Sequence, residues 1–133
     1  MPAEERRWRI GLLLIVLVAT AARAAMILGT LHFTLFGDPE DYQRHAVSIA
    51  TGHGFPDTVI ASAGTPSAFR PPGYPFTLGG LYTVLGIHPQ AGRALSAVLG
   101  VLTVVLIACL GRVVWDRRTG LLAGGIAAMF PPL

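Results

Sequence analysis

The sequence predicts an all-α integral membrane protein with two full transmembrane helices, a truncated third helix, and an outer loop that carries short interfacial helices. Of its 133 residues, 53% are hydrophobic and 13% are charged, whereas a soluble domain has about 25% charged residues. Two apolar runs with at most one charge each have the length of a bilayer crossing. A polar segment rich in Gly and Pro separates them.

The first apolar run extends from Ile10 to Leu31 and contains one charge, Arg23. As a helix it is about 33 Å long, which is enough to cross a bilayer. The basic residues before it and the small residues at 22–25 also fit a signal peptide. Because the apolar character continues to Phe36, we favour an uncleaved transmembrane helix. A charge inside a span is costly, so Arg23 is expected to face protein or a polar cavity.

The second run, Ala94 to Gly111, is uncharged and about 27 Å long as a helix. It crosses the bilayer if Arg93 and Arg112 extend to the two interfaces, which gives a span of about 94–115. The apolar run 119–133 is shorter, about 22 Å, and is expected to be a truncated third span. Residues 1–133 are therefore expected to be the N-terminal part of a longer polytopic membrane domain.

Basic residues predict the topology, because Lys and Arg are retained on the cytoplasmic side. One cluster precedes the first span and another follows the second: Arg6, Arg7 and Arg9, and Arg112, Arg117 and Arg118. If both are cytoplasmic, the N-terminus is inside and the loop 32–92 is outside, in the inner (plasma) membrane of the cell. The apolar stretch 75–87 is about 20 Å long as a helix, too short to cross, so we expect it in the outer interface. In the alternative topology it crosses, which places 112–118 outside.

Several function classes do not fit the composition. The net charge of +3 is small and scattered, so no nucleic-acid-binding surface is expected. Cys109 is the single cysteine and excludes an intrachain disulfide. The four histidines have no metal-ligand spacing, and His45 and His53 are expected to be solvated or interfacial. No metal site is predicted, although a divalent cation stays open as a cofactor.

The outer loop begins with a helix signal, Asp38-Pro39-Glu40-Asp41. Asp38 suits the N-cap and Pro39 the first helical position. Apolar residues then recur at helical spacing until Gly52 and Gly54, which predicts a surface helix over 39–51. On this interpretation the acidic residue at 38 is a helix cap and Arg70 an anchor for lipid headgroups.

The order of the segments along the chain carries a further signal. An apolar span precedes G-D-x-x-D-Y, a short helix ends in G-x-G-F, and A-F-R-P-P-G-Y-P leads into an apolar helix and a second span closed by basic residues. This order resembles the amino-terminal part of bacterial polyprenyl-phosphate-sugar-dependent glycosyltransferases. These are membrane enzymes of the GT-C fold, related to protein O-mannosyltransferases and to the aminoarabinose transferase of lipid A. The resemblance covers nearly the whole chain but only the first part of a family member.

The resemblance implies an active site on the outer loop. Asp38 corresponds to an aspartate that acts on the acceptor as general base or holds the acceptor or a metal near the reaction centre, and Tyr42 is in register with it. The family often has Glu directly after this aspartate. Here Pro39 takes that position, and the acidic residues Glu40 and Asp41 follow one and two positions later. The implied catalytic residues are Asp38 and Asp41, and the implied substrate-binding residues are Glu40, Tyr42, Arg70 and Tyr74.

The implied reaction moves a sugar from a polyprenyl-phosphate donor to an acceptor lipid, glycan or protein at the outer membrane face. Because the leaving group is a lipid phosphate, this chemistry chiefly needs a base on the acceptor and a cation on the departing charge. Arg offers a fork of donors to phosphate oxygens and keeps its charge. The alternative is a small non-catalytic membrane protein or subunit, in which the acidic motif is only a helix cap.

Overall fold

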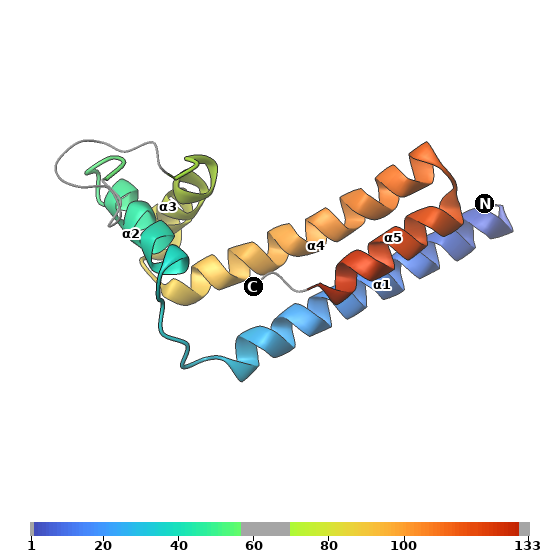
Figure 1. Cartoon of the computed structure of the whole chain (residues 1–133), viewed down its shortest axis with the longest axis horizontal. Coiled ribbons are helices and arrows are strands. Elements are labelled where there is room, and N and C mark those ends of the chain that lie inside the picture. The colour runs from blue at the N-terminus through green and yellow to red at the C-terminus, as the bar shows by residue number, and fades with distance from the viewer. Residues whose placement is uncertain (1, 57–69, 131–133) are drawn as a thin grey trace. The chain divides into compact units, whose positions relative to one another are not determined.

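A computed structural model describes residues 2–56 and 70–130, and every regular element in these ranges is a helix (Figure 1). The helices are α1 (Ala3–Gly29), α2 (Asp38–Ala50), α3 (Gly73–Leu85), α4 (Pro89–Val114) and α5 (Arg117–Met129). The all-helical class is therefore confirmed for the described residues. The chain divides into two compact units. Unit 1 comprises Met1–Leu31 and Ser96–Leu133, and unit 2 comprises His32–Leu95.

Two helices are long and apolar enough to cross a membrane, as predicted. α1 has 27 residues and α4 has 26, and their most apolar windows have mean hydropathies of 2.4 and 2.5. Only 11% and 17% of these windows are buried, whereas a core helix of a soluble protein is mostly buried. Leu13 and Leu106, for example, are 58% and 67% exposed. Such apolar surface is suited to lipid. Both helices begin earlier than predicted, at Ala3 and Pro89.

Unit 1 packs through small residues. Its core consists of Ala19, Val104 and Ala128, one from each of α1, α4 and α5. A Cβ atom on Gly120 would overlap the backbone oxygen of Ala108, so α5 lies directly against the backbone of α4 (Figure 1). Small residues at such a contact let helices approach closely, which is how many membrane helices associate. The predicted run 119–133 is represented by α5, which begins at Arg117, and residues 131–133 lie outside the described part of the chain.

One end of unit 1 gathers charges from α1 and from the α4–α5 turn. Arg112 donates to Glu5 over 2.9 Å, and Arg117 donates to Glu4 over 2.7 Å. The Arg112 guanidinium also lies over the Trp8 ring, 4.2 Å from its centroid, so it is held by protein instead of extending freely to an interface. Both basic clusters thus lie at one end of the unit. Whether 75–87 crosses the membrane, and which side of the membrane this end faces, stay predictions.

The charge within α1 faces protein, as expected. Arg23 is 5% exposed. Its Nη1 donates to the Ala19 oxygen over 3.1 Å and its Nη2 to the Phe130 oxygen over 3.4 Å. Gly100 of α4 makes room for the guanidinium, because a Cβ atom there would lie 2.6 Å from Nε. Arg23 therefore ties the end of α5 to α1.

Unit 2 is built on the contact between α2 and α3. Ala46, Leu78 and Tyr82 form its core, with Ala91 and Leu95 from the first turns of α4 packed against it. The predicted helices 39–51 and 75–87 are found as α2 and α3, each shifted by one or two residues. Gly52, with a φ of 81°, follows the end of α2 in a conformation that glycine adopts readily, as expected for a stop signal.

Candidate functional site

The candidate site begins at the first turn of α2. The prediction that Asp38 is the N-cap is wrong. Gly37 takes this position with a φ of 70°, Asp38 is the first helical residue, and no side chain caps the helix. A left-handed φ suits glycine. The carboxylate of Asp38 is consequently available for another partner, and it accepts a hydrogen bond from Arg70.

Arg70 joins the two aspartates. Its Nη2 donates to Asp38 Oδ1 over 2.5 Å, and its Nε donates to Asp41 Oδ2 over 2.7 Å. Asp38 and Asp41 are three residues apart in α2, so they are neighbours on the surface of this helix. The sequence predicted these three residues for the site, and the structure brings them together within unit 2.

The two aspartates differ in burial. The side chain of Asp38 is 70% exposed, whereas that of Asp41 is 1% exposed and that of Arg70 is 10% exposed. The hydrogen bonds that Arg70 donates to Asp38 and then to Asp41 raise the pKa of the guanidinium above its usual value. Arg70 is thus a buried, permanently charged group. The interpretation of Arg70 as an exposed headgroup anchor does not fit this geometry.

A second guanidinium, which the sequence analysis did not single out, contacts the same buried carboxylate. Arg44 Nη2 lies 3.2 Å from Asp41 Oδ1, and the Arg44 side chain is 43% exposed. Asp41 therefore receives Arg44 on one oxygen and Arg70 on the other. The i,i+3 spacing between Asp41 and Arg44 is the sequence signal that could have indicated this pair.

His45 lies beneath the same carboxylate. Of the two expected environments, solvated or interfacial, the first is wrong, because the His45 side chain is fully buried on the side of α2 that carries Ala46 and Asp41. Nδ1 is 2.7 Å from the Asp41 backbone oxygen. Since a carbonyl oxygen only accepts, Nδ1 carries the proton in this bond. The ring also packs edge-on against Phe55, with centroids 4.6 Å apart. His53 is exposed, as expected.

Two tyrosines extend the site towards α3. The Arg70 guanidinium lies over the Tyr42 ring, 5.0 Å from its centroid. Tyr42 meets Tyr74 edge-to-face at 5.5 Å, and the Tyr74 hydroxyl donates to the Gly92 oxygen over 3.3 Å. Tyr42 therefore contacts Arg70 directly, whereas Tyr74 supports Tyr42 from α3. Glu40 is exposed at the first turn of α2.

The described residues offer no group of three or more His, Cys, Asp or Glu side chains that could hold a metal ion. Asp38 and Asp41 both face a guanidinium, so a cation of the protein already stands between them. This donor set does not fit a divalent metal with Arg70 in place.

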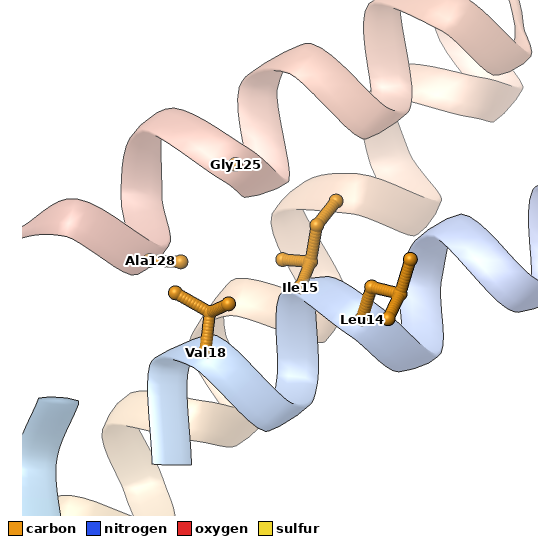
Figure 2. A pocket seen from close by; sticks show the side chains of 5 residues that line it. All are labelled: Leu14, Ile15, Val18, Gly125 and Ala128. Carbon is orange, nitrogen blue, oxygen red and sulfur yellow. The ribbon is translucent and has the colours of Figure 1, made fainter. Parts of the chain in front are cut away.

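Two hollows in unit 1 are less suited to chemistry. Figure 2 shows a groove between α1 and α5, whose lining contains only aliphatic side chains and a glycine: Leu14, Ile15, Val18, Gly125 and Ala128. These residues offer no polar side chain to a reacting atom. A second hollow is lined by charged residues of both signs: Glu4, Arg112, Asp116, Arg117 and Arg118. Arg117 pairs with Glu4, and Arg112 pairs with Glu5 beside the hollow. The convergent polar groups of unit 2 are therefore the better candidate.

No protein-family model matches this chain, and no curated protein and no solved structure matches it either. The function is therefore argued from the site, and the resemblance to membrane glycosyltransferases stays a prediction from sequence motifs.

Proposed function

We propose that this chain provides the acceptor-activating and phosphate-binding part of a membrane glycosyltransferase. The enzyme moves a sugar from a polyprenyl-phosphate donor to an acceptor lipid, glycan or protein at the outer membrane face. The observation that carries the proposal is the convergence of Asp38, Asp41 and Arg70 in unit 2, from positions 29 and 32 residues apart in the chain.

The residue types match the needs of the reaction. The acceptor oxygen attacks the anomeric carbon, the bond from that carbon to the phosphate oxygen breaks, and the electron pair leaves with the phosphate. Asp38 takes the proton of the acceptor hydroxyl, because it is the exposed carboxylate of the pair. Arg70 stabilises the departing phosphate with charge-assisted hydrogen bonds. Attack opposite the leaving group inverts the anomeric centre, by the logic of single displacement.

The membrane character of unit 1 supports a lipid-linked donor. Two helices with exposed apolar surfaces are suited to lipid, and the polyprenyl chain of such a donor resides in the same phase. An inner-membrane location with a cytoplasmic N-terminus belongs to the proposal, since it places the loop that carries the site at the outer face.

The second candidate is a non-catalytic membrane subunit. Its original form, with Asp38 as a helix cap, is excluded by the absence of a cap bond. One observation favours a modified form: Arg70 ties the segment before α3 to two points of α2, so the ion pairs have the geometry of a structural clamp. A clamp requires the charges for stability, whereas an enzyme requires them for turnover.

Replacement of Arg70→Gln at the native locus separates the two candidates. We expect the envelope to lose a sugar modification, detected by mass spectrometry of its lipids, glycans and proteins, while the protein persists at its normal level. Arg9→Gln, which alters an exposed arginine of α1, is the control. An unchanged envelope with normal amounts of the Arg70→Gln protein contradicts the enzyme proposal.

A further inference from the structure

Asp41 holds two guanidinium groups at once. Arg44 contacts Oδ1 and Arg70 contacts Oδ2, so the two cations are separated by one carboxylate. Asp41 is 1% exposed, but Arg44 is 43% exposed. Because Asp41 is buried, it fixes the positions of both guanidinium groups. Arg44 is partly exposed, so it can also contact a ligand that binds from outside.

Asp38 is the exposed acid of this cluster. Among the described residues, Asp38 and Asp41 both pair with Arg70, and Asp41 also pairs with Arg44. The side chain of Asp38 is 70% exposed, whereas that of Asp41 is 1% exposed. An anion that arrives from outside can therefore replace Asp38 at Arg70 and keep a negative partner beside the guanidinium. The phosphate groups of a polyprenyl-phosphate sugar and of a polyprenyl monophosphate are both such anions.

We infer that Arg44 and Arg70 form a paired guanidinium site for a lipid phosphate, that Asp41 orients the pair, and that Asp38 occupies the site until the phosphate displaces it. The inference rests on the proposed function and adds to it a new binding residue, Arg44, and an order of events. Guanidinium pairs suit this role because each presents parallel donors to phosphate oxygens. Displacement from Arg70 frees the Asp38 carboxylate, so the base for the acceptor becomes available only after the donor has bound.

Two substitutions that each remove one negative charge test this arrangement. Asp38→Asn and Asp41→Asn each remove one negative charge beside the phosphate, so simple electrostatics predicts that both tighten binding. The inference predicts opposite effects. Asp38→Asn should tighten binding about tenfold, because a competing anion is lost. Asp41→Asn should weaken it about tenfold, because both guanidinium groups then lose the buried carboxylate that orients them.

The experiment measures binding of a polyprenyl monophosphate to the full chain in detergent micelles, by native mass spectrometry or thermophoresis. We expect Arg70→Gln and Arg44→Gln to weaken binding, by roughly a hundredfold and roughly tenfold, since bonds to a charged partner are the stronger class. Arg44→Lys should restore part of the loss, because it keeps the charge but not the fork. Arg9→Gln should bind as the unaltered protein does. Circular dichroism checks that each variant is helical.

Three further probes identify the source of the phosphate. Polyprenyl alcohol, inorganic phosphate and vesicles of phosphatidylglycerol replace the polyprenyl monophosphate in turn. Equal binding of the alcohol, or equal affinity for free phosphate or phosphatidylglycerol, overturns the assignment of the ligand class.

The outcomes separate this inference from the proposed function. If the unaltered chain binds the lipid phosphate and Arg70→Gln weakens it, but Arg44→Gln does not, the inference is wrong and the proposed function stands. Tighter binding by both Asp38→Asn and Asp41→Asn also overturns the inference alone. If the unaltered chain binds none of the phosphates, the donor site of the proposed function fails as well.

Discussion

Asp41 and Arg70 lie 29 residues apart in the chain, yet Arg70 Nε donates to Asp41 Oδ2 over 2.7 Å in an environment that leaves 1% of the aspartate exposed. The bond joins the first turn of α2 to the residue that precedes the Pro71-Pro72-Gly73 turn. It places a permanent positive charge beside the exposed Asp38, which is the relationship that the proposed chemistry requires.

The first prediction concerns the stability of unit 2. Asp41→Asn should lower the melting temperature by several degrees more than Asp38→Asn, because it removes the charge of the buried carboxylate that pairs with the nearly buried Arg70, whereas Asp38 is largely exposed. Thermal unfolding in detergent, followed by circular dichroism, compares the two. An equal drop in melting temperature in both variants would show that the burial of Asp41 does not make it more important for stability than Asp38.

The second prediction tests the packing of α5 on α4. Gly120→Ala should destabilise the protein by about 1–3 kcal/mol, since its Cβ would overlap the backbone of Ala108. Gly125→Ala is the matched control, because a Cβ at Gly125 meets nothing within 4 Å. Alanine there favours the helix by up to about 1 kcal/mol. Chemical unfolding in mixed micelles measures both. Equal losses at the two glycines contradict the close contact.

The third prediction concerns topology. In a Cys109→Ala background, a single cysteine at Thr83 should react with an impermeant thiol reagent added outside the cell, and one at Arg118 should not. Both positions are exposed, so burial does not protect either. Ser62, another residue of the predicted outer loop, lies outside the described residues. Labelling of Arg118→Cys from outside would mean that the N-terminal end of α1 is also outside, since Glu5 and Arg112 are in contact.

The fourth prediction concerns the pH dependence of unit 2. Burial raises the pKa of the Tyr82 phenol above its ordinary value of 10.0, against the opposing effect of its hydrogen bond to Gln43. The folded state therefore favours the neutral phenol, and this contribution to stability is complete below pH 10 and is lost as the pH rises through the raised pKa. Ultraviolet absorbance of the folded protein, with Tyr82→Phe as reference, should show one tyrosine that ionises late. If all three tyrosines ionise at the same pH, the expected effect of burial on the pKa of Tyr82 is contradicted.

Local patterns predicted much of the fold. The apolar runs predicted α1 and α4, because length and hydropathy are properties of a continuous segment. The Asp-Pro signal predicted α2, and the apolar stretch 75–87 predicted α3, each to within two residues. The N-cap was misassigned because Asp and Gly are both accepted there, and the choice of Gly37 depends on the partner that Asp38 finds elsewhere.

The site was only partly predictable. Asp38, Asp41 and Arg70 were chosen for their chemistry, but no periodicity connects α2 to a residue 29 positions away. Arg44 was overlooked and His45 was not assigned to the site, although both are at helical spacing from Asp41. Their importance arises from the burial of Asp41, which is a consequence of the packing of α2 against α3 and cannot be read from a polar sequence.

The most direct test of the central claim is sugar transfer by Asp38→Asn in membranes from cells that carry the change at the native locus. The variant must first be shown to bind polyprenyl monophosphate at least as tightly as the unaltered protein, so that loss of the donor does not explain the result. The account predicts that transfer falls about a hundredfold or more, the low end for loss of a general base, while the protein level and lipid binding are kept. Transfer at the normal rate by a variant that binds the lipid would contradict it.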